Sequence, residues 1–109
     1  MCIGERGDRW RERVEVLVTY DVATDSAAGR RRLRRVAKVC EGFGQRVQKS
    51  VFECTVNEVQ LELLKHRLRM EVKPSEDSLR IYRLREPRER FLYTMGVQPE
   101  FDMHDPIVI

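Results

Sequence analysis

One acidic residue, Asp21, stands where an apolar, β-branched run of the sequence ends. The run covers positions 16–22 and reads Val-Leu-Val-Thr-Tyr-Asp-Val, so the carboxylate directly follows Tyr20. A carboxylate at a strand end either forms a turn by accepting hydrogen bonds from backbone amides or binds a divalent cation. Mg²⁺ prefers about six oxygen ligands and keeps several as water, so one carboxylate makes a poor site. A two-fold dimer would bring two copies of Asp21 together, and a cation between them would relieve their repulsion.

A block of basic residues is the second feature that bears on function. Between positions 30 and 38 the chain has no acidic residue and six basic ones: Arg30, Arg31, Arg32, Arg34, Arg35 and Lys38. Such a block on one element is the electrostatic signature of a polyanion partner, but solvated helix faces also carry such charges. The formal charge of the whole chain is only +3, and residues 96–109 carry acids but no lysine or arginine. Charge alone supports nucleic-acid binding and a solvated face equally.

The elements that must position these residues can be predicted from the pattern of apolar residues. Residues 13–20 alternate and are rich in β-branched side chains, which predicts a strand. Ser26 can cap a following helix with an apolar stripe at positions 33, 36, 37 and 40, and glycines at 42 and 44 end it. Residues 45–54 are extended in character, either as one bent strand or as a hairpin turning near residues 49–50.

The second half of the chain repeats this order of elements. Asn57 and Gln60 resemble a capping box, and an amphipathic helix follows and ends before Pro74. Residues 78–84 alternate as a strand, a short strand is expected at 91–94, and a final apolar stretch covers 107–109. The order β-α-β-β-α-β predicts an α+β, ferredoxin-like (split β-α-β) fold, with one antiparallel sheet and two helices on one face.

This fold leaves one face of the sheet to be covered, and a homodimer would cover it. We expect residues 1–12 to form a flexible extension, 13–95 to form the domain, and 96–109 to be a tail whose final strand contacts a second subunit or another partner. The three cysteines have no paired spacing, so neither a zinc site nor a disulfide framework is predicted. No stretch approaches the ~18 apolar residues of a membrane span, which predicts no membrane partner and, by default, a cytoplasmic location.

Four blocks of the sequence, in order and at characteristic spacing, resemble a known family. They are Tyr-Asp-Val at 20–22, Gly-Arg-Arg-Arg-Leu at 29–33, Arg-Val-Gln-Lys-Ser-Val-Phe-Glu at 46–53 and Asp-Ser-Leu-Arg-Ile-Tyr at 77–82. Together they resemble the second CRISPR-associated adaptation protein, a small dimeric partner of the spacer-integrating enzyme. The tail at 105–109 is similar to the type I-C branch of that family. The family usually begins at its first strand, whereas twelve residues precede it here.

The resemblance implies roles for individual residues. Asp21 matches the family's ligand for Mg²⁺ or another divalent cation at the dimer cleft, and Tyr20 matches the aromatic residue beside it in the catalytic site. The basic positions imply binding of DNA, RNA or both, and the resemblance adds Arg46 to Arg30, Arg31, Arg32, Arg34 and Arg35. Ser50 and Phe52 match a supporting Ser-x-Phe pair. The simpler alternatives are that Tyr20 and Phe52 are aromatic rings of the core, that Ser50 satisfies backbone hydrogen-bonding groups at a bend, and that Arg32 is a charge on the helix surface.

The resemblance also implies two functions between which the sequence does not decide. Members of the family are described as metal-dependent endonucleases on single-stranded RNA or duplex DNA, and as structural centres of an integration complex. The chain is therefore expected to be either a Mg²⁺-dependent endonuclease of CRISPR spacer adaptation or a non-catalytic DNA-binding scaffold for the CRISPR integrase. A small regulatory domain without nucleic acid is a third alternative, and the arginine block argues against it. No residue stands out as a general base, so the metal would have to activate the attacking water.

Overall fold

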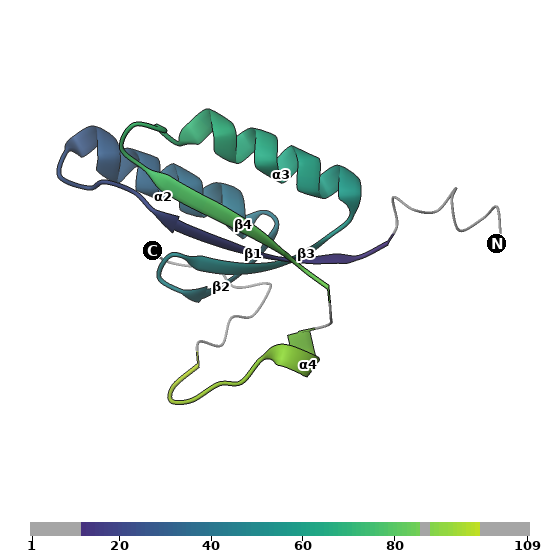
Figure 1. Cartoon of the computed structure of the whole chain (residues 1–109). Helices are drawn as coiled ribbons and strands as arrows, with labels where there is room; N and C mark the ends of the chain where they lie inside the picture. Colours follow the sequence, from purple (N-terminus) through teal and green to yellow (C-terminus); the bar gives the residue numbers. More distant parts are fainter. Residues whose placement is uncertain (1–11, 86–87, 99–109) are drawn as a thin grey trace.

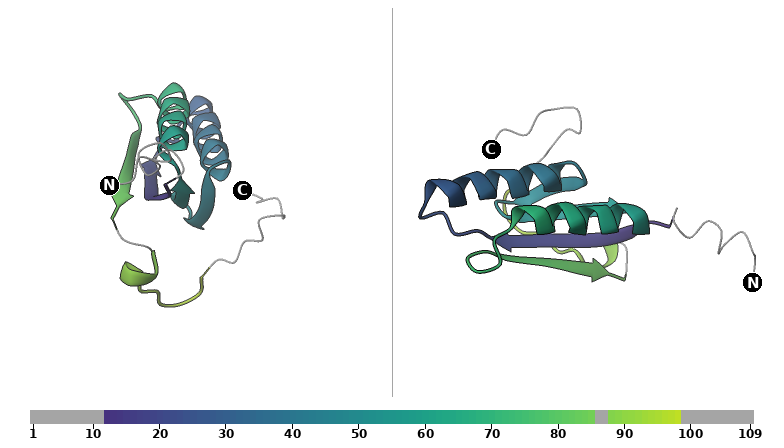
Figure 2. Two further views of the ribbon diagram at one scale, coloured as in Figure 1. Left: turned by 90° about the vertical axis from the view of Figure 1, so that its right-hand side faces the viewer. Right: turned by 90° about the horizontal axis from the view of Figure 1, so that it is seen from above.

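The computed structural model describes residues 12–85 and 88–98, which form one sheet, two long helices and a helical turn (Figure 1). The elements are β1 (Val14–Asp21), α2 (Ala27–Glu41), β2 (Gly44–Gln48), β3 (Val51–Val56), α3 (Glu58–Glu71), β4 (Ser78–Leu84) and α4 (Arg88–Phe91). The strands are antiparallel in the order β2-β3-β1-β4, and α2 and α3 lie side by side on one face (Figure 2). The α+β, ferredoxin-like fold is therefore confirmed.

The first strand organises the core because it is central and alternates strictly. Its even-numbered residues from Val14 to Tyr20 are buried against the helices, and its odd-numbered residues face the other way. Successive side chains of a strand point to opposite faces, so this alternation separates a core side from a second side. Val18 is fully buried and pairs with Phe52 of β3, which is also fully buried. The core thus lies between the sheet and the two helices.

The helices begin where the sequence indicates, and each start is capped. The Ser26 hydroxyl accepts a hydrogen bond from the Gly29 amide at 3.0 Å. Gly29 is required here because a Cβ at this position would lie 1.9 Å from the Ala23 carbonyl oxygen. Without a side chain, the start of the helix can pack directly onto the loop after β1. At α3, Asn57 and Gln60 form the predicted capping box. Both caps satisfy backbone amides that would otherwise lack partners.

The structure decides between the predicted alternatives for the middle of the chain and corrects one element near its end. Residues 45–54 form a hairpin, β2 and β3, that turns at Lys49 and Ser50. The strand predicted at 91–94 is wrong: residues 88–91 form the helical turn α4 and residues 92–95 are irregular. No strand among the described residues pairs with this segment. Without hydrogen bonds to a neighbouring strand, its β-branched and aromatic residues are not enough to form a strand. The expected strand at 107–109 and the first eleven residues of the expected extension lie outside the described residues.

The face of the sheet opposite the helices carries no covering layer among residues 12–85. It presents half-buried Leu17 from β1, and Tyr82 from β4, whose exposed fraction is 43%. We call this surface the open face. The turn α4 lies on that side of the sheet (Figure 1). The last residue of α4 and the segment after it expose five large apolar side chains: Phe91, Leu92, Tyr93, Met95 and Val97. Within the part of the chain that the structure describes, none of the helices is long and apolar enough to span a bilayer.

Candidate functional site

The candidate metal ligand Asp21 is the last residue of β1 and is exposed on the open side of the sheet. It pairs in register with Ser78, the first residue of β4, which is exposed as well. Among the described residues, no group of three or more histidine, cysteine or acidic side chains is placed to hold a metal ion. One chain therefore offers a single accessible carboxylate rather than a complete cation site.

Tyr20 lies on the other side of the sheet, although it is adjacent to Asp21 in sequence. Its ring is 6% exposed and stacks on Phe52 with 6.3 Å between ring centroids and an interplanar angle of 24°. Its buried hydroxyl has no hydrogen-bond partner among the described residues. Burial raises the pKa of Tyr20 to about 12, and the positive charge of Arg46 acts against this rise. The structure places Tyr20 and Phe52 in the core, directly beneath the strand end, and does not bring Tyr20 to the Asp21 side.

Arg46 points from β2 toward the rings of Tyr20 and Phe52. Its guanidinium carbon lies 5.0 Å from the centroid of the Phe52 ring, a cation–π arrangement. Its Nη1 donates to the Lys49 carbonyl oxygen, and its Nη2 lies 3.9 Å from Glu41 Oε1, with side-chain exposures of 15% and 23% for the two ionic partners. Arg46 was expected to bind nucleic acid, but the structure directs it inward, where it braces the β2–β3 hairpin.

Ser50 acts through its backbone at the turn of that hairpin. Its carbonyl oxygen accepts a hydrogen bond from the Tyr20 amide at 3.1 Å. The bond ties the β2–β3 turn to the last residues of β1, next to Asp21. The bond uses a backbone carbonyl, which any residue would supply, and so assigns no role to the Ser50 hydroxyl.

The arginine block lies on α2, and the structure separates its members. Those at positions 30, 31, 34 and 35 are exposed, as is Lys38. Arg32 is different, because its side chain is only 14% exposed and is occupied by acidic partners. The exposed members form a strongly positive surface on the outside of the helix layer, which fits contacts with a phosphate backbone.

Asp77 was not among the residues predicted to form the site, yet it has the densest set of polar contacts near Asp21. Its carboxylate accepts hydrogen bonds from Arg32 Nε (2.8 Å) and Nη2 (3.2 Å), and from the amides of Ala23 (3.2 Å) and Lys73 (2.9 Å). Its side chain is 0% exposed, and these bonds, those from Arg32 first, lower the pKa of Asp77 to about 2. The only available signal was its position at the start of the 77–82 block.

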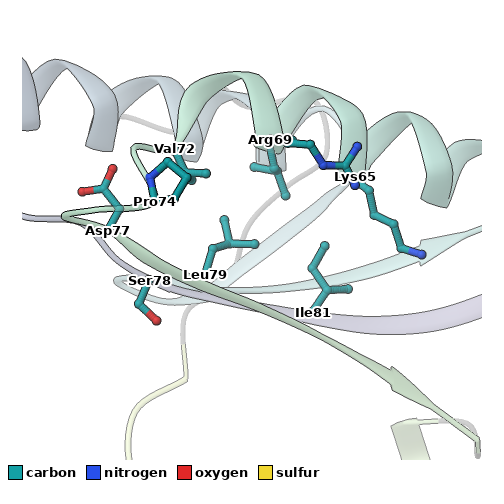
Figure 3. Close-up of a pocket in the computed structure, with 9 residues that line it drawn as sticks. Lys65, Arg69, Val72, Pro74, Asp77, Ser78, Leu79 and Ile81 are labelled. Carbon is teal, nitrogen blue, oxygen red and sulfur yellow. The ribbon is translucent and has the colours of Figure 1, made fainter.

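Asp77 stands at the end of a groove between α3 and β4 (Figure 3). The groove has an apolar floor and basic side chains along α3, and its lining includes Lys65, Leu68, Arg69, Val72, Leu79 and Ile81. In Figure 3 the turn that carries Pro74 and Asp77 closes this end of the groove, and Ser78 begins the strand. The turn therefore connects the C-terminal end of α3 to the start of β4, whose first residue, Ser78, pairs with Asp21.

Comparisons with known proteins agree with the fold described above. The family described as CRISPR associated protein Cas2 matches residues 14–90. The CRISPR-associated endoribonuclease Cas2 1 of Moorella thermoacetica is 56% identical over 94 residues, which are 86% of this chain and 98% of that protein. The CRISPR-associated endonuclease Cas2 of Halalkalibacterium halodurans is 48% identical over 93 residues, 85% of this chain and 97% of that protein. The crystal structure of Streptococcus pyogenes Cas2 at pH 6.5 is similar with a TM-score of 0.69 and 50% identity, over 75% of this chain and 99% of that one.

Proposed function

The chain belongs to the Cas2 family of CRISPR-associated proteins, and on this premise we propose that it is a metal-dependent endonuclease of CRISPR spacer adaptation with Asp21 as the metal ligand. The observation that carries this proposal is the exposed Asp21 carboxylate at the end of β1, on the face that the helices leave open. The names of its relatives include both endoribonuclease and endonuclease, so RNA and DNA are both substrates to be tested.

The site that we propose is shared by two copies of the chain. A single Asp21 carboxylate does not make a cation site, and the described residues supply no further acidic cluster. The open face carries Leu17 and Tyr82, and the segment after β4 exposes apolar side chains, so this side offers surface that a second copy can bury. An isologous dimer about a two-fold axis would place both copies of Asp21 near one cleft.

The available donors fit a hard divalent cation such as Mg²⁺. Mg²⁺ is commonly held by one or two carboxylates together with water and substrate phosphates, and two Asp21 carboxylates provide such a set. The Ser78 hydroxyl lies on the neighbouring strand at the same register position. When bound, the cation would neutralise charge on the phosphate and lower the pKa of a water molecule.

The other residues would bind the substrate and hold the strand end in place. The exposed arginines of α2 are placed to neutralise phosphates along the nucleic acid. Tyr20, Phe52 and Arg46 pack beneath the strand end and keep its direction fixed, and Ser50 ties it to the hairpin turn. The reduced thiols Cys40 and Cys54, both buried, fit a reducing cytoplasm as the place of action.

The test compares wild type with Asp21→Asn, and uses Asp25→Asn as the matched control. Asp25 is an exposed acid in the loop after β1, so its replacement removes the same charge without touching the strand end. Cleavage of single-stranded RNA and duplex DNA is followed with and without Mg²⁺. We expect Asp21→Asn to reduce cleavage by about 100-fold or more and Asp25→Asn to leave it unchanged. Undiminished cleavage by Asp21→Asn would remove the proposed site.

The same variants test the scaffold alternative, which the positive surface of α2 favours. DNA binding and spacer integration are measured with a CRISPR integrase supplied as partner. If Asp21→Asn abolishes cleavage but supports full integration, the chain acts mainly as a dimeric DNA-binding scaffold in adaptation. If integration is lost together with cleavage while DNA binding is kept, the nuclease site is required for adaptation.

A further inference from the structure

The contacts of Asp77 join three segments that meet around the candidate ligand Asp21. Ala23, whose amide donates to Asp77, lies two residues after Asp21 in the loop that leads to α2. Arg32 belongs to the second turn of α2, and Lys73 begins the turn after α3. Ser78, the neighbour of Asp77 in the chain, is the register partner of Asp21. Asp77 therefore fixes both the loop that follows Asp21 and the strand residue beside it.

The hydrogen bonding of this carboxylate is complete. Two oxygens offer about four acceptor sites, and four donors fill them: the two guanidinium nitrogens of Arg32 and the amides of Ala23 and Lys73. A fully covered carboxylate leaves no oxygen for a metal ion or a substrate. Its role must therefore be exerted through the groups it holds, and Ala23 is the closest of these to Asp21 in the sequence.

We propose that Asp77 is a positioning residue for Asp21, and that Arg32 is part of this internal clamp rather than of the nucleic-acid surface. The catalytic consequence rests on the proposed nuclease function, whereas the structural part does not. The bidentate geometry of Arg32 on Asp77 is charge-assisted and directional, so it sets the distance between α2 and the turn before β4. The exposed Arg31 next to it has no such bond to any residue that the structure describes, and its guanidinium is available for phosphate.

The experiment compares four variants in the full-length chain. Asp77→Asn keeps the shape of the side chain but removes its charge. Arg32→Gln removes the guanidinium, and with it the two bonds to Asp77 and the ion pair with Glu76. Glu76→Gln is the matched control, because Glu76 lies 4.0 Å from Arg32 and accepts no bond from the loop after β1. Arg31→Gln is the control for a purely surface arginine. Hydrogen exchange of residues 20–25 is measured together with kcat and KM for nucleic-acid cleavage.

We expect Asp77→Asn to raise exchange at Ala23 by roughly 10-fold or more, which corresponds to the loss of one hydrogen bond to a charged acceptor. Misplacement of a ligand by about 1 Å can reduce turnover about 100-fold, so kcat should fall between roughly 10- and 100-fold while KM changes less than about 2-fold. Arg32→Gln should shift both readouts in the same directions. Glu76→Gln should match wild type, and Arg31→Gln should raise KM without lowering kcat.

Several results would overturn this inference. Wild-type exchange at residues 20–25 in Asp77→Asn would show that the loop is held by other contacts. A rise in KM alone for Arg32→Gln, as for Arg31→Gln, would return Arg32 to the nucleic-acid surface. If Asp77→Asn does not fold, Arg32→Gln and the closer replacement Arg32→Lys decide the matter, since both leave the backbone bonds of Asp77 in place. If wild type does not cleave, the proposed function fails, but hydrogen exchange still tests the clamp.

Discussion

The two faces of the sheet differ sharply, and one strand supplies both. On β1, Tyr20 is buried under the helices while Asp21, the next residue, is exposed on the other side. The covered face is closed by apolar side chains from the sheet and both helices. The open face carries polar and half-buried apolar groups with no layer over them among residues 12–85. The comparison indicates that the covered face supplies stability and holds the strand end from beneath, whereas the open face presents the chemistry.

The largest contrast between the faces is expected in stability. Phe52 is fully buried beneath the strand end, so Phe52→Ala should lower the free energy of unfolding by about 3–5 kcal/mol. Tyr82 is on the open face and 43% exposed, so Tyr82→Ala should cost the single chain less than about 1 kcal/mol. Urea unfolding at a low protein concentration measures both. Equal losses would show that the open face is as much a core as the covered one.

Between the two faces, at the turn that holds the end of β1, the stability of the fold is expected to depend on pH through Asp77. Its pKa is lowered from 3.8 to about 2, so the folded state holds the ionised form more strongly than the unfolded chain does. This contribution is present above about pH 4 and is lost as the pH falls toward 2. Asp77→Asn should therefore lower the melting temperature at pH 7 by roughly 5–10 °C and flatten its acid dependence between pH 4 and 2.

Thermal unfolding at a series of pH values, with Glu76→Gln alongside, provides the check on this prediction. Glu76 is partly exposed and holds no backbone amide of the loop after β1, so its variant should keep the acid dependence of wild type. If Asp77→Asn loses as much stability as wild type between pH 4 and pH 2, another carboxylate must be responsible for the acid dependence.

The smallest effects should come from the outer surface of α2, which takes no part in either face of the sheet. Replacing Arg31 and Arg34 by Gln should leave stability unchanged within about 0.5 kcal/mol. Each phosphate contact that is lost should reduce the slope of log affinity against log salt by about 0.9 on B-DNA. Fluorescence anisotropy from low to moderate salt measures the slope, and Arg32→Gln serves as the comparison. An unchanged slope for the double variant would place the nucleic acid elsewhere.

Much of the fold could be predicted because its signals are local. The alternation of β1, the apolar stripe of α2 and the caps at Ser26 and Asn57 all involve residues within a few positions of one another. The strand predicted at 91–94 is wrong because the formation of a strand depends on a non-local partner, which the local sequence does not reveal. A strand needs a partner as well as a suitable composition, and no neighbouring strand among the described residues provides one.

The candidate site was predictable only in part. The position of Asp21 at a strand end follows from the sequence. Tyr20 was expected beside it in the catalytic site, whereas the alternation of the strand turns Tyr20 to the covered face. The inward direction of Arg46 does not follow, since a basic residue near the start of a strand suits a surface equally well. Its actual neighbours, the Phe52 ring and Glu41, come from a second strand and from the end of a helix.

The sequence by itself determined the order of elements from β1 to β4, the side of β1 that forms the core and the exposed carboxylate at its end. Only the tertiary structure decided which arginines face solvent and what holds the strand end in place. Asp77 is 45 positions from Arg32 and 54 positions from Ala23, so no local pattern links them. Periodicity identifies the face of an element, whereas the partner of a side chain depends on how the helices pack over the sheet.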